Sequence, residues 1–154
     1  MKKILEVLVH DRPGVLDRIV GLIRRRSWNI DSMTVGDTGD GLSQMTFQLE
    51  GRDVDLAPLG DLLSEMDTVR SWREITEADG FLREMLLFRV PEGDPLSRAE
   101  NTRVVGARDG MLDCEFTDLP SRADAYAKEL QARGVRCVRS GPLPLMDGED
   151  DAHA

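Results

Sequence analysis

The sequence predicts an α+β fold in which two β-α-β-β-α-β units follow one another, the second in abbreviated form. Apolar and polar residues alternate along several short segments, as in strands that are buried on one face. Between some of them, apolar residues recur every three to four positions, as on one face of a helix. Over residues 3–76 the order is strand, helix, strand, strand, helix, strand. This is the ferredoxin-like arrangement, an antiparallel sheet with two helices on one face.

The first strand is predicted over residues 3–10, and the sequence Asp11-Arg12-Pro13-Gly14 breaks its extended pattern. Apolar residues at helical spacing then predict a helix from Val15 to about Ser27. Pro13 fits the first turn of this helix, and Asp11 can accept hydrogen bonds from its free N–H groups.

The rest of the first unit follows from the same two patterns. The segments expected are a strand over 29–36, a turn over 37–41, a strand over 42–50, a helix over 53–66 and a strand over 69–76. They complete a first domain over residues 1–77, and residues 78–83 are expected to form a linker. An exposed sheet face or edge is expected to pair with another copy, so a homodimer is predicted.

The second unit repeats this order in shorter form over residues 84–145. Strands are expected over 84–90, 102–107, 111–117 and 135–139, and only residues 96–101 are left for the first helix. Asp109-Gly110 is a hairpin signal, and Ser121 with Asp124 resembles a capping box for the second helix, which Gly134 ends. The acidic residues 146–154 are expected to be a disordered tail.

The charge balance excludes several kinds of partner. The 154 residues include 20 Lys and Arg against 29 Asp and Glu, a net charge of −9. This acidity argues against nucleic-acid binding and against anionic membrane surfaces. No run is long enough for a membrane helix, and the N-terminus lacks the features of a signal peptide, so a cytoplasmic protein is expected.

The two cysteines, Cys114 and Cys137, fit the role of small buried hydrophobes. In the expected strand order, the third and fourth strands of the second unit lie on either side of the first. The cysteines would then be two strand spacings apart, about 10 Å, which is too far for a disulfide.

Motifs of catalysis and cofactor binding do not occur in the sequence. It contains no nucleophile elbow and no P-loop, and residues 36–41 do not fit a dinucleotide fingerprint. Gly39-Asp40-Gly41 is interpreted as a turn. With two histidines, one of them in the tail, the chain has few groups for metal or acid–base catalysis. A non-enzymatic protein without a cofactor is therefore expected.

Five stretches resemble one family. They are Met1–Leu8, Gly14 with the helix after it, Trp28–Val35, Leu42–Thr46 and Arg83–Leu87. Together they resemble an ACT domain and, more closely, the regulatory small subunit of acetolactate synthase. The resemblance is specific over residues 2–50 and weak beyond about residue 90. It implies a pocket between two ACT domains, in which the loop of one chain faces the second strand of its partner.

The residues themselves suit an amino-acid ligand, and those expected at the site are Asp11, Arg12, Pro13, Gly14, Val15, Asn29 and Ile30. A helix N-terminus suits the ligand carboxylate, Gly14 permits close approach, and Asn29 offers a donor and an acceptor. Asp11 fits two roles, ligand contact and N-cap. Ile30 and Met33 fit the core better than a pocket wall. An aliphatic wall would favour valine, leucine or isoleucine.

Three functions are compatible with these observations. The resemblance favours a regulatory subunit that binds a branched-chain amino acid and controls a separate, thiamine-diphosphate-dependent catalytic large subunit. The alternative is a stand-alone ACT sensor that acts on another enzyme. A small ferredoxin-like enzyme would need a cluster of titratable residues in a pocket, which the sequence does not show.

Overall fold

A computed structural model describes residues 1–79 and 81–145 of the chain. Its contacts divide it into two compact units, one formed by Met1–Phe81 with the segment from Pro144, the other by Leu82–Leu143. The acidic tail predicted over 146–154 lies outside the described residues. Each unit is described by itself.

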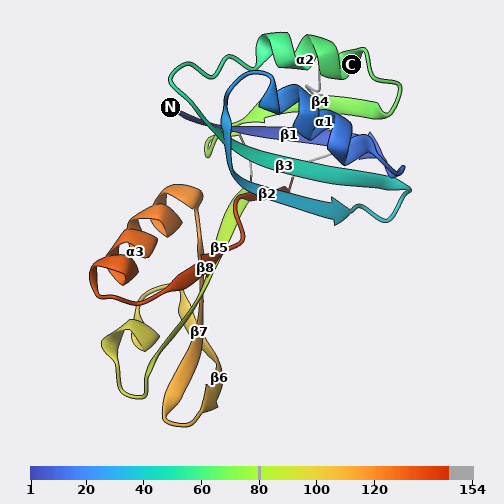
Figure 1. The fold of residues 1–154 in the computed structure, drawn as a ribbon. Coiled ribbons are helices and arrows are strands. Elements are labelled where there is room, and N and C mark those ends of the chain that lie inside the picture. The colour runs from blue at the N-terminus through green and yellow to red at the C-terminus, as the bar shows by residue number, and fades with distance from the viewer. Residues whose placement is uncertain (80, 146–154) are drawn as a thin grey trace. The chain divides into compact units, whose positions relative to one another are not determined.

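The first unit has the predicted element order (Figure 1). Its elements are β1 (Lys2–His10), α1 (Val15–Arg24), β2 (Asn29–Asp37), β3 (Leu42–Glu50), α2 (Ala57–Ser64) and β4 (Val69–Ile75). The strands form an antiparallel sheet in the order β2-β3-β1-β4, with β2 at one edge. The predicted ferredoxin-like arrangement is therefore confirmed.

One apolar core holds this sheet and its two helices together. Alternate residues of β1, among them Leu5 and Val7, are fully buried against Ile19 of α1 and Leu59 of α2. Both helices therefore cover the same face of the sheet (Figure 1). The alternation that predicted the strands is the alternation of this buried face.

Helix α1 begins differently from the prediction. Its N-cap is Gly14 in the left-handed conformation, with φ of 86°, and no side chain of the described residues caps it. Asp11 is therefore not the N-cap, and Pro13 precedes the helix instead of lying in its first turn. Asp11 N–H donates instead to the carbonyl of Gly41 at 3.1 Å. Glycine adopts positive φ without a steric penalty, and this lets the chain turn sharply into the helix.

Helix α2 is shorter than the predicted span of 53–66. Pro58 lies at its start and favours the first turn, and the Asp55 carboxylate accepts a hydrogen bond from the N–H of Ala57. Val54 and Leu56 are buried in the core as part of the preceding loop. The apolar residues of this loop extended the predicted helix because their side chains fill the same core as those of α2.

The second unit is built from β5 (Phe81–Pro91), a 3₁₀ turn (Pro95–Arg98), β6 (Thr102–Arg108), β7 (Met111–Asp118), α3 (Pro120–Ala132) and β8 (Cys137–Arg139). Strand β9 (Leu143–Leu145) follows at the point in the chain where the second unit ends. The order β6-β7-β5-β8 repeats that of the first unit, with the 3₁₀ turn in place of the first helix. The abbreviated second unit is therefore confirmed. Strand β5 begins within the predicted linker 78–83, and β9, which pairs with β5, was not predicted.

Two details of the second unit test local predictions. Helix α3 begins at Pro120 without a side-chain cap, so the capping box of Ser121 and Asp124 is wrong. Proline at the first helical position fixes the helix start instead. Cys114 and Cys137 are free thiols that lie opposite Phe88 from its two neighbouring strands, as the expected strand order required.

Candidate functional site

The loop before α1 is an open backbone turn. Residues 11–14 are exposed, and a Cβ atom placed on Gly14 would meet no described atom within 4 Å. The carbonyl of Gly14 accepts from the N–H of Arg18 at 3.1 Å, which forms the first helical hydrogen bond. An anion can therefore approach the start of α1 closely, where the helix dipole is positive.

Val15 differs from the other predicted loop residues. Its side chain is only 3% exposed and belongs to the core. Its N–H lies 3.4 Å from the carbonyl of Arg12, which closes the turn. The side chain of Val15 is thus part of the core, and its contact with a ligand stays a prediction.

The other two predicted site residues, Asn29 and Ile30, lie at the opposite end of the sheet. Asn29 is paired with Glu50, which is paired in turn with Lys2 at the start of β1. The loop follows His10 at the far end of β1. Lys2, which is level with Asn29, and His10, which precedes the loop, are eight strand residues apart, or about 27 Å at about 3.4 Å per residue. A single chain therefore does not bring Asn29 and Gly14 together.

Strand β2 presents an apolar surface at the sheet edge. Met33 and Val35 are paired with core residues of β3, yet they are 42% and 48% exposed. Ile30 is half-buried and packs against the core, as predicted. Met33 was predicted to fit the core, but an edge strand has no neighbour to cover it. Its position at the edge, not its residue type, decides its exposure.

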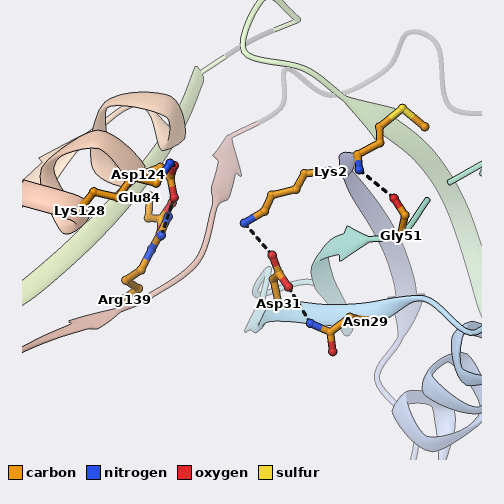
Figure 2. A network of polar contacts seen from close by, with 9 residues as sticks. Lys2, Asn29, Asp31, Gly51, Glu84, Asp124, Lys128 and Arg139 are labelled. Atoms are coloured by element: carbon orange, nitrogen blue, oxygen red, sulfur yellow. Dashed lines mark hydrogen bonds and ion pairs between the residues drawn. The ribbon is translucent and has the colours of Figure 1, made fainter. Parts of the chain in front are cut away.

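Asn29 belongs to a small polar network at the start of β2 (Figure 2). Its Nδ2 donates to Asp31 Oδ1 at 2.7 Å, and Lys2 Nζ lies 2.8 Å from Asp31 Oδ2. Burial raises the pKa of Asp31, but the hydrogen bonds from Lys2 and Asn29 outweigh it and hold the pKa below its usual value. Sequence patterning did not single out Lys2 or Asp31.

A second network fastens the second unit internally (Figure 2). Glu84 of β5 is only 1% exposed and accepts two hydrogen bonds from Arg139 of β8, at 2.7 and 3.1 Å. Arg139 also donates to Asp124 of α3 at 3.0 Å, and Asp124 lies 2.7 Å from Lys128. Bonding to Glu84 raises the pKa of Arg139. Every charge in this network is compensated, which suits a structural role in holding β5, β8 and α3 together.

A groove with a volume of about 570 Å³ lies between α1 and α2. Its lining includes Arg18, Gly21, Leu62 and Glu65, but neither Gly14 nor Asn29. Within the part of the chain that the structure describes, no group of three metal-binding side chains could hold an ion. No helix of this part is long and apolar enough to cross a membrane.

The sequence and fold are similar to those of known proteins. The model of the AHAS small subunit-like ACT domain matches residues 5–71. A probable acetolactate synthase small subunit of Archaeoglobus fulgidus is 33% identical, over 96% of this chain and 98% of that protein. The acetolactate synthase small subunit of Mycolicibacterium smegmatis is 31% identical, over 94% of this chain and 90% of that protein.

The chain belongs to the acetolactate synthase small-subunit family. The crystal structure of the acetolactate synthase small subunit from Thermotoga maritima has the same fold, with a TM-score of 0.77 and 22% identity over 94% of this chain and 96% of that chain. The similarity to the small-subunit family therefore extends across both units, farther than the sequence motifs alone indicated. Membership assigns the chain the role of a regulatory subunit.

Proposed function

We propose that this chain binds a branched-chain amino acid between two of its copies and thereby controls a catalytic large subunit of acetolactate synthase. The observation that carries this proposal is the separation of Gly14 and Asn29 to opposite ends of one sheet that has an apolar open edge. A second copy can bring the two together.

Antiparallel pairing of two β2 strands about Met33 has the required geometry. In such a pair Asn29 of one copy would lie opposite Asp37 of the other. Within each copy, Asp37 is level with the loop, because Asp37 pairs with Ser43 and His10 pairs with Leu42 next to it. Asn29 of one protomer would therefore approach the loop before α1 of its partner, at each of two equivalent sites.

The chemistry of the two halves is complementary to an amino acid. The ligand carboxylate suits the positive end of α1 above Gly14. The amide of Asn29 offers an acceptor for the ligand ammonium group. Val35, two positions before Asp37 on the same strand, supplies exposed aliphatic surface near this site, which suits a branched aliphatic side chain. These features support valine, leucine or isoleucine as the effector.

Regulation requires a partner that performs the chemistry. The small subunits similar to this chain carry the name of acetolactate synthase, and we assign the catalytic step to a separate large subunit in the cytoplasm. An effector that binds one arrangement of the two subunits better than another shifts their equilibrium by its differential affinity.

Calorimetric titration of the purified protein with L-valine, L-leucine and L-isoleucine tests the site. We expect saturable binding of at least one of them, with one ligand per chain. Absence of binding by all three would refute the proposal.

Met33→Lys tests the interface, because it places two like charges side by side across the symmetry axis. We expect sedimentation to show a dimer for the wild type and dissociation for this variant.

A further inference from the structure

We propose that Asp31 is a positioning residue, which orients the Asn29 amide so that its Oδ1 atom receives the ammonium group of a bound amino acid. This inference rests on the proposed function, since it concerns the same site. It adds a residue that makes no contact with the ligand itself.

The chemistry of the two side chains fixes the orientation of the amide. A carboxylate at neutral pH only accepts hydrogen bonds, so the amide atom that faces it must be the donor, Nδ2. Asn29 Nδ2 lies 2.7 Å from Asp31 Oδ1. Figure 2 shows Oδ1 of Asn29 directed away from this network. The acceptor is thereby left for a ligand, while the donor is occupied.

Asp31 is itself held in place by two features of the fold. Lys2 Nζ lies 2.8 Å from its second oxygen, and the Asp31 side chain is 16% exposed. The register between β2 and β3 shifts between Ile30 and Ser32, which makes Asp31 the extra residue of a bulge. Bulges re-aim side chains and are frequent beside functional sites. Lys2, Asp31 and Asn29 therefore form a chain in which each side chain fixes the next.

The orientation matters because an ammonium group only donates hydrogen bonds. An amide that turned its Nδ2 toward the ligand would place donor against donor. If Asp31 were absent, the Asn29 amide could adopt either orientation. Binding would then require that the amide be ordered again, which weakens affinity without loss of any direct contact.

A double-mutant cycle tests this role by calorimetry with L-valine, L-leucine or L-isoleucine, whichever the wild type binds. We expect Asp31→Ala to weaken binding roughly tenfold, as expected for one hydrogen bond to a charged group. Asn29→Ala should weaken it at least as much. The double variant should bind no more weakly than Asn29→Ala, because Asp31 acts only through Asn29. A merely structural role of Asp31 would make the two losses add.

The matched control is Glu74→Ala. It removes a carboxylate that pairs with the neighbouring lysine, Lys3, at 3.0 Å, but on β4 at the other edge of the sheet. This variant should bind as the wild type does. Normal binding by Asp31→Ala, or additive losses in the double variant, overturns the inference while the amino-acid site stands. If the wild type binds none of the three amino acids, the proposed function itself fails.

Discussion

Gly60 of α2 lies directly against Trp72 of β4, so closely that a Cβ atom at residue 60 would be 1.8 Å from Cζ2 of the indole. The indole Nε1 donates to the hydroxyl of Ser64 one turn farther along α2, at 3.1 Å. The absence of a side chain at residue 60 is thus what allows the helix to pack on this strand.

Gly60→Ala should therefore destabilise the first unit, although alanine favours helices. Overpacking of a rigid ring costs about 1–3 kcal/mol. Both tryptophans, Trp28 and Trp72, belong to this unit, so tryptophan fluorescence during denaturation reports on it. Gly21→Ala in α1 is the matched control, since no described atom lies within 4 Å of its added Cβ. We expect the control to stabilise by about 0.5–1 kcal/mol. Equal effects of both variants would contradict this account.

Strands β1 to β8 and their order along the chain were predictable because the apolar residues that alternate along them form the buried face of each sheet. The exact starts of the helices were harder to predict, because several neighbouring residues could each begin or cap a helix. Pro58 and Pro120 fix the starts of α2 and α3. The pattern of apolar residues instead predicted an α2 that is too long, and Ser121 was wrongly predicted to belong to a cap of α3. Gly14 itself, and not Asp11, takes the N-cap position, because the tight turn needs a positive φ.

The residues of the two halves of the candidate site were predictable, but their positions relative to each other were not. Gly14 and Asn29 follow from the loop chemistry and the family resemblance. Their separation follows from topology, since β1 and β2 both run antiparallel to β3 and are therefore parallel to each other. Residues at the end of one and the start of the other must lie far apart. Lys2 and Asp31 lie in stretches that resemble the family, but nothing in the sequence pairs them, and only the fold shows that they meet.

Arg139→Met should destabilise the second unit strongly. Glu84 is buried, and loss of its partner would leave an uncompensated charge, which costs about 3–5 kcal/mol. Hydrogen exchange of the β5 and α3 amides measures the effect within this unit. The control is Arg103→Met, which breaks a pair with Glu115 whose arginine is 72% exposed. That loss should not exceed about 1 kcal/mol. Comparable losses would show that burial of Glu84 carries no penalty.

The same network makes the second unit sensitive to acid. Hydrogen bonds from Lys128 and Arg139 lower the pKa of Asp124. A group with a lowered pKa in the folded state stabilises the fold above its unfolded value of about 3.9, and this contribution is lost as the pH falls through the folded value. Asp124→Asn should therefore be less stable than the wild type at pH 7 and should lose less stability between pH 5 and pH 3. Parallel stability curves for the two proteins would rule out this role.

Gly14→Asp should abolish amino-acid binding while the fold is retained. It places a carboxylate beside the position proposed for the ligand carboxylate, and like charges at contact distance repel by about 4 kcal/mol near a protein surface. The control is Gly14→Asn, because asparagine and aspartate both tolerate the left-handed conformation that this residue adopts. We expect the aspartate variant to bind at least tenfold more weakly than the asparagine variant in calorimetry. Equal affinities would show that no carboxylate sits at this loop.

The last prediction concerns the catalytic partner. Alone, the chain should form no acetolactate from pyruvate. Mixed with its cognate large subunit, it should raise the rate and confer sensitivity to valine, leucine or isoleucine. The sensitivity is a coupling free energy of typically about 1–3 kcal/mol, so the affinity of the small subunit for the amino acid should change about 5–150-fold when the large subunit is bound. Because coupling is reciprocal, the same amino acid should change the affinity between the two subunits by the same factor, which sedimentation of the mixture can measure.

Gly14→Asp should remove the sensitivity and leave the increase in rate, because it blocks the effector without touching the partner. If no large subunit associates and pyruvate turnover does not respond, while the amino acid still binds, the site serves a stand-alone sensor of another enzyme.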